Sequence, residues 1–215
     1  SCTPCWVQHP ALASQAVQLT GLLISVQRHG EALHGDWRLG LAPQALAGSW
    51  QGNLSQQHLA LKLSLPASPI AHAYRALAPA LPEVARARIA GHFSLQASVR
   101  LPDGRWQLQP ELHAMRVSGL GTEALQQLPR SGLPPQHALA RAVLAAEDQR
   151  FAEHQGFDPN QWQQVLAQAH LGSAQLRGAS TLTQQLAKLM FTDGERSALR
   201  KLRELLYAVE MEETL

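Results

Sequence analysis

Residues 147–158 read E-D-Q-R-F-A-E-H-Q-G-F-D, an acidic pair followed at short spacing by an aromatic residue, a histidine and a glycine. The pair ends a run with helical spacing, so Glu147 is predicted to share a buried helix face with the apolar residues before it. Those apolar residues are Leu139, Val143 and Ala146. A carboxylate that loses hydration favours its protonated form, which suits a glutamate to proton transfer near neutral pH. The residues alone leave open a surface Glu147 that pairs with Arg150 or Arg141.

Two further stretches follow in the chain. Residues 178–188 read G-A-S-T-L-T-Q-Q-L-A-K, and residues 200–212 read R-K-L-R-E-L-L-Y-A-V-E-M-E. The three stretches resemble, in order, the first three signatures of the peptidoglycan glycosyltransferases, glycosyltransferase family 51. The first signature, E-D-x-x-F-x-x-H-x-G-x-D, is matched at all its fixed positions, which are Glu147, Asp148, Phe151, His154, Gly156 and Asp158. The resemblance covers the last third of the chain, from about Pro134 onward.

The resemblance implies an all-α, lysozyme-like glycosyltransferase domain over residues 136–215. The catalytic domain of the family continues past its third signature, so we expect only the N-terminal part of that domain here. We therefore expect residues 1–215 to be inactive alone. Family members are anchored by one N-terminal membrane helix. The chain has no apolar run of about 18 residues, so we expect that helix to lie upstream of Ser1. The implied location is the periplasmic face of the bacterial inner membrane.

Residues 1–125 are predicted to form a β-rich domain. Apolar and other residues alternate in three runs, which predicts half-buried antiparallel strands. The apolar positions are Trp37, Leu39 and Leu41, then Leu59, Leu61, Leu63 and Leu65, then Phe93, Leu95, Ala97, Val99 and Leu101. Pro102-Asp103-Gly104 predicts a hairpin turn. The Ala-rich residues 70–89 are predicted to be helical with interruptions at Pro79 and Pro82, and Trp37, Trp50 and Trp106 to be core residues.

Residues 126–135 have the composition of a linker, because proline and glycine gather there. The predicted fold class is therefore α+β, with an N-terminal antiparallel β-rich domain at 1–125, a linker at 126–135 and a partial glycosyltransferase domain at 136–215. Asp158, Pro159 and Gln161 predict the start of a helix, and Thr181 with Gln184 has capping-box spacing for the next one. Residues 160–177, with Trp162, match a membrane-facing jaw of the family, although a plain core helix fits almost as well.

The reaction implied by the resemblance is elongation on lipid II. The 4-hydroxyl of one sugar displaces undecaprenyl pyrophosphate from C1 of another, with inversion. By resemblance, Glu147 is the catalytic base. Glu204 is a second catalytic carboxylate that helps to place the donor phosphates, and the two glutamates are candidate ligands of a divalent cation, Mg²⁺ or Mn²⁺, acting through the pyrophosphate. The i,i+4 spacing of Arg200 and Glu204 is equally consistent with a surface ion pair.

The second signature predicts one polar stripe on a helix. Thr181, Gln184, Gln185 and Lys188 fall on it, opposite Leu182, Leu186 and Leu189. The stripe begins at a helix N-terminus, which favours anions, and the lysine of the family contacts the pyrophosphate; a solvated face is the alternative. The predicted substrate-binding residues are Asp148, Phe151, His154, Ser180, Thr181, Gln184, Gln185, Lys188, Arg196, Arg200 and Lys201.

Composition bounds the partners. The chain has 215 residues and a formal net charge of +2, without a dense basic run, so nucleic acid is not expected as a partner. The expected partners are lipid II, the growing glycan strand, the membrane surface and cell-wall synthesis proteins. Cys2 and Cys5 lie in an irregular, proline-flanked start, so a short-range disulfide in an oxidising compartment is favoured over a redox motif.

Two rival classes are weighed against this interpretation. A lytic, muramidase-like hydrolase is disfavoured because it would need one catalytic glutamate and no R-K-x-x-E partner. A non-catalytic envelope scaffold would keep a remnant of the enzyme, and the intact Glu147, Lys188 and Glu204 argue against such decay.

Overall fold

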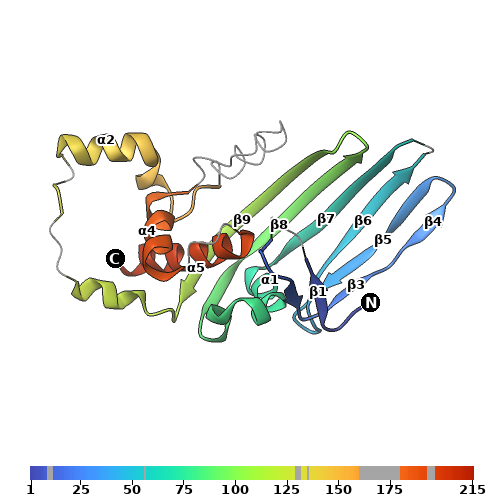
Figure 1. Cartoon of the computed structure of the whole chain (residues 1–215), viewed down its shortest axis with the longest axis horizontal. Coiled ribbons are helices and arrows are strands. Elements are labelled where there is room, and N and C mark those ends of the chain that lie inside the picture. Colours follow the sequence, from blue (N-terminus) through green and yellow to red (C-terminus); the bar gives the residue numbers. More distant parts are fainter. Residues whose placement is uncertain (9–11, 56, 129–131, 135, 160–179, 193–196) are drawn as a thin grey trace.

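The computed structural model describes residues 1–8, 12–55, 57–128, 132–134, 136–159, 180–192 and 197–215 (Figure 1). It is a mixed structure that combines antiparallel sheets with several helices, as the predicted fold class requires at this level. Figure 1 shows the long strands at one end of the molecule and helices α2 (Ala138–Glu147) and α4 (Leu182–Phe191) at the other. Within the described ranges, no helix is long and apolar enough to cross a membrane.

The larger sheet has seven strands, and every neighbouring pair is antiparallel. Its order is β3-β5-β6-β7-β8-β9, with β4 also paired to β5. The strands are β3 (Leu22–Ile24), β4 (Gln27–His29), β5 (Ala32–Leu39), β6 (Leu46–Leu54), β7 (Leu59–Pro69), β8 (Arg88–Leu101) and β9 (Arg105–Ser118).

The alternating runs of the sequence are confirmed as strands β5, β7 and β8, except that Leu41 lies beyond the end of β5 and is exposed. In β5, half-buried and exposed residues alternate along the whole strand, because successive side chains point to opposite faces. The register places Leu63 of β7 opposite Ala97 of β8, so the apolar positions of neighbouring strands share one face. The predicted hairpin is also confirmed, since residues 102–104 form the turn between β8 and β9.

The Ala-rich segment at residues 70–89 is only partly helical. It begins with helix α1 (Ile70–Ala76), continues through two 3₁₀ turns, η1 (Ala78–Ala80) and η2 (Pro82–Ala85), and ends inside strand β8. Pro79 is the second residue of η1 and Pro82 the first residue of η2, positions at which the missing N–H of proline is tolerated. The prediction of a mainly helical segment was therefore wrong at its end, where Arg88 and Ile89 pair with β9.

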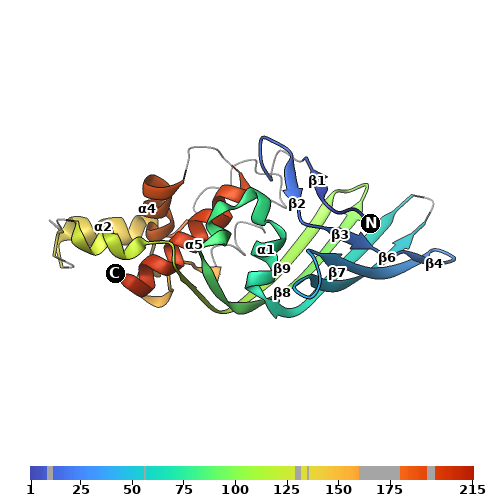
Figure 2. The same ribbon diagram turned by 90° about the horizontal axis from the view of Figure 1, so that it is seen from below.

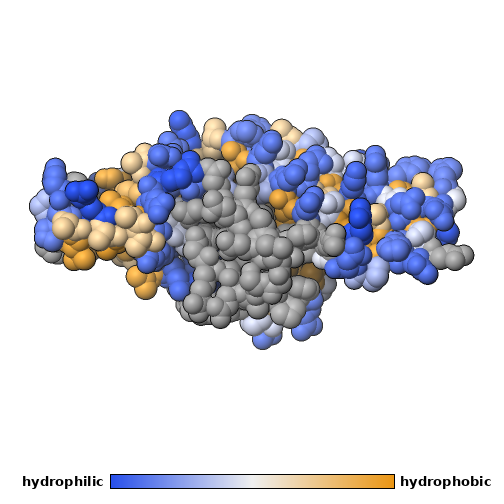
Figure 3. Space-filling model, turned by 90° about the horizontal axis from the view of Figure 1, so that it is seen from above, coloured by the Kyte–Doolittle hydropathy of each residue, from blue (hydrophilic) through white to orange (hydrophobic). Residues whose placement is uncertain are grey.

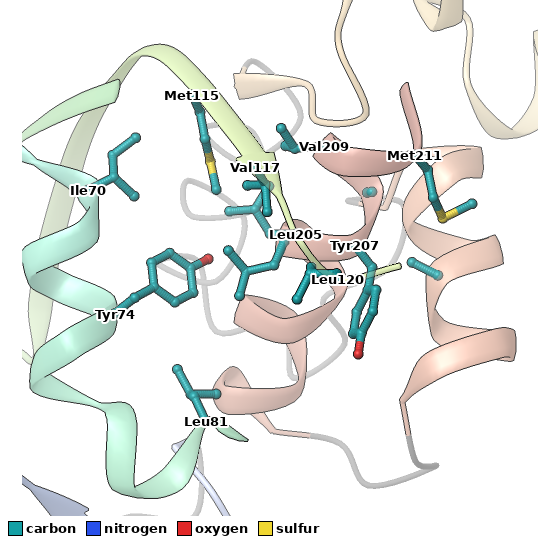
Figure 4. Close-up of a cluster of buried hydrophobic side chains, with 13 residues drawn as sticks. Ile70, Tyr74, Leu81, Met115, Val117, Leu120, Leu205, Tyr207, Val209 and Met211 are labelled. Atoms are coloured by element: carbon teal, nitrogen blue, oxygen red, sulfur yellow. The ribbon is translucent and has the colours of Figure 1, made fainter. Parts of the chain in front are cut away.

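One hydrophobic core joins the sheet to the C-terminal helix α5 (Ala198–Thr214) (Figures 2 and 4). Ile70 and Tyr74 of α1 and Val117 of β9 meet Leu205 and Val209 of α5 in this core. An ion pair adds to the contact, because Nε of Arg203 in α5 donates to Oε1 of the buried Glu83 in η2 at 2.7 Å. Helix α5 is thus fixed against the strand-rich part of the chain. The boundary at 126–135 stays a prediction.

The N-terminal segment forms a small satellite of this fold. Strands β1 (Cys5–Val7) and β2 (Val17–Leu19) form a two-stranded antiparallel sheet. The predicted disulfide between Cys2 and Cys5 is present. Trp37 and Trp50, predicted as core residues, are only half-buried, and the side chain of Trp106 lies outside the described part of the molecule.

Tyr74 ties α1 to α5, and we expect Tyr74→Phe to lower the free energy of unfolding by about 1 kcal/mol at neutral pH. Its buried hydroxyl donates to the carbonyl oxygen of Leu202 at 3.1 Å, and burial raises the pKa of Tyr74 above its usual value. A raised pKa in the folded state means that stability falls once pH exceeds the unfolded pKa, about 10. Urea unfolding at neutral and alkaline pH should show that the difference in unfolding free energy between the wild type and the variant decreases above about pH 10. A difference that stays constant with pH would contradict this role.

Candidate active site

The three signature segments of the sequence meet beside α5. The first spans the end of α2 and the 3₁₀ turn η4 (Phe151–Glu153), the second enters α4, and the third forms most of α5. Helices α4 and α5 pack against each other, so the second and third signatures are neighbours. Hydrogen bonds described below connect the first signature to both.

Glu147, the predicted base, is the last residue of α2 and is exposed. The prediction that it lies on a buried face was wrong, because Leu139 and Val143 on that face are 57% and 40% exposed. Helical spacing shows which residues share a face, but it does not show what covers that face. Figure 3 shows apolar residues at the surface at the α2 end of the molecule. The carboxylate of Glu147 accepts a hydrogen bond from Nε2 of Gln185 at 3.3 Å.

Asp148 is buried and joins the first signature to the second. Its Oδ2 accepts a hydrogen bond from the backbone N–H of Leu182 at 2.9 Å, and its Oδ1 lies 2.9 Å from Nε2 of His154. A carboxylate at a helix N-terminus satisfies an orphan N–H group and meets the positive end of the helix dipole. Asp148 therefore orients the start of α4, and the side chain of His154 is buried beside it.

We expect Asp148→Ala to destabilise the fold by roughly 2–3 kcal/mol, because it leaves a buried N–H and a buried imidazole without their acceptor. The neighbouring Gln149→Ala removes an exposed side chain and serves as the control. Chemical unfolding of both variants measures the difference. Equal stability of the two variants would show that Asp148 does not hold α4.

The signature glycine, Gly156, allows the first signature to approach α5. Its φ is +76°, and a Cβ atom on it would lie 2.5 Å from the carbonyl oxygen of Ala208. Only glycine fits such a contact in a left-handed conformation without strain. The carbonyl oxygen of Gly156 accepts a hydrogen bond from Oγ1 of Thr181 at 2.8 Å. Nearby, the buried Asp158 pairs with Arg150 at 3.1 Å, while Phe151 is 38% exposed.

Helix α4 buries much of its polar stripe. Thr181 and Gln184 form the predicted capping box and are both 1% exposed, whereas Lys188 is exposed. The solvated-face alternative is therefore wrong for the first turn and correct for Lys188. Leu189, on the apolar side, is 82% exposed. Helix α4 contacts α5 through a residue outside the stripe, because Oγ1 of Thr183 donates to Oε1 of Glu212, whereas Thr181 bonds to Gly156 and Gln185 to Glu147.

On α5, Glu204 holds two cations. Its Oε1 accepts a hydrogen bond from Nη1 of Arg200 at 2.5 Å, and its Oε2 accepts one from Nζ of Lys201 at 2.7 Å. Glu204 is 0% exposed and Arg200 is 9% exposed, so the alternative of a surface ion pair is wrong. Nζ of Lys201 also donates to Oγ of Ser180 at 2.5 Å. Two positive charges against one negative charge leave this cluster with a local excess of one positive charge.

A line of hydrogen bonds connects the predicted residues. Gln185 donates both to Glu147 and, at 3.4 Å, to the backbone oxygen of Ser180. Ser180 in turn accepts from Lys201, which is bound to Glu204. The structure thus brings together the predicted base, the second-signature polar residues and the third-signature cations.

The donor set around Glu204 does not fit a direct metal ligand, because both of its oxygens already accept from cationic side chains. Within the described residues, no group of three or more His, Cys, Asp or Glu side chains could hold a metal ion. The predicted divalent cation stays a prediction. Arg196 and residues 160–177, including Gln161 and Trp162, lie outside the described residues.

Sequence reasoning did not single out Glu210, which is buried on α5. Its Oε1 accepts from the backbone N–H of Leu120 at 2.7 Å, and its Oε2 accepts from that of Thr122 at 3.3 Å. These bonds fix the start of the 3₁₀ turn η3 (Thr122–Gln127) to α5. No spacing signal marked Glu210, because it lies off the four-residue repeat that carries Arg200, Glu204 and Glu212.

Comparison with known proteins identifies the family. The family model described as Transglycosylase matches residues 116–215. Residues 116–215 belong to the transglycosylase family. A biosynthetic peptidoglycan transglycosylase of Ectopseudomonas mendocina is 43% identical over 115 residues, which are 50% of this chain and 47% of that protein. One from Thiobacillus denitrificans is 47% identical over 76 residues, covering 35% of this chain and 33% of that protein.

A longer but weaker match extends into the strand-rich part. Penicillin-binding protein 1A of Escherichia coli is 30% identical over 154 residues, which are 70% of this chain and 16% of that protein. The chain thus spans less than half the length of these three curated relatives. No match to a solved structure was found. The transglycosylase region covers all three signatures, so the predicted family resemblance is confirmed.

Proposed function

We propose that the full-length protein polymerises lipid II into β-1,4 glycan strands, with inversion at C1 and release of undecaprenyl pyrophosphate. The observation that carries this proposal is the hydrogen-bonded line from Glu147 through Gln185 and Ser180 to Lys201. It connects an exposed carboxylate to a cluster with excess positive charge. The named relatives, biosynthetic peptidoglycan transglycosylases, support the polymerisation of glycan strands.

Glu147 is the proposed general base. Its carboxylate is exposed, so an acceptor sugar can reach it, and the amide of Gln185 orients it. In the proposed step, Glu147 takes the proton of the acceptor 4-hydroxyl as that oxygen attacks C1 of the donor sugar. The bond from C1 to the pyrophosphate oxygen breaks on the opposite side, and the leaving group keeps the electron pair. Inversion in one displacement needs the base and the leaving-group contacts to stand apart.

Lys201, Arg200 and Lys188 are the proposed contacts of the departing pyrophosphate. Cationic side chains stabilise the charge that develops on a phosphate leaving group, and they do so best when held in place beforehand. Glu204 supplies that order, because it binds both Arg200 and Lys201 while fully buried. We therefore assign Glu204 as a positioning residue for the two cations, in place of the direct catalytic role expected from the sequence.

The remaining expectations stay within this proposal. They include the lysozyme-like form of the domain, the order of a β-rich domain before it, and the divalent cation. They also include contact with the membrane surface and cell-wall synthesis proteins at the periplasmic face of the inner membrane. The exposed apolar residues of α4, Leu186, Leu189 and Met190, support a contact with lipid.

The decisive experiment is a polymerisation assay of the full-length gene product with purified lipid II. We expect glycan strands and undecaprenyl pyrophosphate as products. Binding of lipid II without any polymer would favour the non-catalytic scaffold, and absence of both would remove the proposal.

Lys188→Ala tests the pyrophosphate contact in the same full-length protein. We expect lipid II to bind about tenfold more weakly, since a hydrogen bond to a charged group is lost. Lys188 is exposed, so the melting temperature should not change. Arg38→Ala, which removes an exposed cation from the polar face of β5, is the control. Unchanged affinity for lipid II would exclude Lys188 from the site.

A further inference from the structure

Among the described residues, the apolar face of the large sheet is covered at one end only. Near the helices, Phe93 and Leu112 on neighbouring strands pack against the core that contains α1 and α5. Beyond that end, the same face continues along β5 to β9, and Figure 1 shows these strands extending away from α1 and α5. A sheet face of this kind normally packs against another layer. The uncovered part of the face therefore needs an explanation.

A groove of about 710 Å³ occupies this part of the sheet. Every described residue that lines it belongs to a strand of the sheet. They are Leu22, Ile24, Leu33, Trp37, Trp50, Leu59, Leu61, Lys62, Leu63, Ala97, Ser98, Val99, Gln107 and Leu108. None of these side chains is among the fully buried residues of the described chain. The volume lies within the range of about 300–1,000 Å³ that is typical of small-molecule sites.

Two tryptophans form part of the floor of the groove, and each lies over a glycine of the neighbouring strand. Trp37 pairs with Gly48 of the next strand, and Gly35 pairs with Trp50. A Cβ atom on Gly48 would lie 2.6 Å from the ring of Trp37, and one on Gly35 would lie 2.9 Å from Nε1 of Trp50. Each indole therefore lies against the sheet, over a glycine. Nε1 of Trp50 donates to the backbone oxygen of Ser25 at 3.0 Å, so this polar atom already has its partner.

The shape and the mainly apolar lining of the groove favour one class of ligand over the others. An extended peptide would bring an N–H and a C=O group with every residue, and the lining offers few partners for them, namely Lys62, Ser98, Gln107 and Nε1 of Trp37, which is unpaired among the described residues. A helix about 10 Å wide, rising 1.5 Å per residue, occupies roughly 120 Å³ per residue, so the groove would hold under two turns. In a two-fold dimer, a second copy would place its own groove opposite this one, and two concave surfaces leave an unfilled cavity between them. A hydrocarbon chain has no polar group to satisfy and fits a narrow apolar groove.

We propose that this groove binds the acyl chain of a membrane lipid. The proposal does not depend on the transglycosylase activity, because no described residue of the three signatures lines the groove. The polar residues among the lining, Lys62, Ser98 and Gln107, are the groups that could meet the lipid headgroup. The strand-rich part of the chain would then hold a lipid while the C-terminal helices carry the glycosyltransferase site.

Quenching of tryptophan fluorescence by a brominated fatty acid tests the proposal on residues 1–215. We expect 9,10-dibromostearate to quench the wild-type chain in a saturable manner below its micelle concentration. A double variant, Trp37→Phe with Trp50→Phe, should lose most of this quenching, because both indoles form the floor. Quenching that is unchanged in the double variant would overturn the proposal.

Matched substitutions on the two faces of the sheet locate the site. Ala97→Phe fills the groove with an apolar ring, whereas Ala47→Phe makes the same change at an exposed position of β6. We expect binding to weaken about tenfold in the first variant and not in the second. Leu61→Gln, which puts an amide into the groove, should also weaken binding about tenfold. Thermal melts of all variants separate loss of binding from loss of the fold.

Competition identifies the ligand. Stearate and a phosphatidylglycerol should each displace the brominated probe. Displacement by undecaprenyl phosphate alone would overturn the acyl assignment. A concentration-dependent dimer that Ala97→Phe abolishes in the absence of lipid would show that a second copy covers the face, and would also overturn it.

Discussion

Glu147→Gln in the full-length protein is expected to lower the rate of glycan polymerisation by about 10²–10⁴, the usual effect of losing a general base. Lipid II should still bind, because Glu147 is exposed and the cationic cluster on α5 is intact. The amide of a glutamine can replace the carboxylate in contact with Gln185, so the local structure should persist. A polymerisation assay at saturating lipid II, with a binding titration beside it, measures both effects.

Glu153→Gln is the matched control for this prediction. Glu153 is an exposed carboxylate in the same signature, and its change removes the same charge. It pairs with Arg150 at 2.8 Å, so a small loss of stability is expected and no loss of rate. If Glu147→Gln polymerises lipid II at the wild-type rate, Glu147 is not the base. A similar loss of rate in both variants would point to a general electrostatic effect.

The strands could be predicted from the sequence because period-two alternation is a local property. β5, β7 and β8 appear where apolar residues alternate, and Pro102-Asp103-Gly104 turns the chain between β8 and β9. The end of the segment 70–89 was mispredicted as helix from its alanine content. It belongs to β8, where pairing with β9 holds it in a strand. Such pairing joins residues far apart in the sequence, and local composition does not reveal it.

Burial was the property that sequence reasoning predicted worst at the site. The apolar residues before Glu147 indicated a buried face, but α2 has no buried residue in the part of the chain that is described. Conversely, the i,i+4 spacing of Arg200 and Glu204 fits a surface pair as well as a buried one, and the structure buries it. Spacing within one helix determines which side chains are neighbours. What lies over them depends on other segments.

The contacts that connect the signatures to each other also could not be predicted from local sequence patterns. Asp148 reaches the N-terminus of α4, and Ser180 reaches Lys201 of α5. The family resemblance named these residues without giving their partners. The structure supplies a physical role for each of them, namely to fix the start of α4 and to hold the ammonium group of Lys201.

Glu204→Ala is expected to lower the free energy of unfolding by roughly 3–5 kcal/mol, because it leaves buried positive charge without its counter-charge. The side chain of Arg200 is only 10% exposed and that of Lys201 28%, so water can replace the lost carboxylate only in part. Domains of ordinary stability have an unfolding free energy of about 5–15 kcal/mol in total, so we expect a large fraction of the variant molecules to be unfolded at moderate temperature.

Glu213→Ala and Glu204→Gln separate charge from shape in this test. Glu213 is exposed on the same helix, and its removal should change stability by at most about 0.5 kcal/mol. Glu204→Gln keeps an acceptor oxygen of similar shape but no charge, so its stability should lie between those of the other two variants. Urea unfolding of residues 1–215 gives all three values. If Glu204→Ala is as stable as Glu213→Ala, then Glu204 does not hold the two cations. Its conservative variant would then be expected to leave lipid II binding unaffected in the full-length protein.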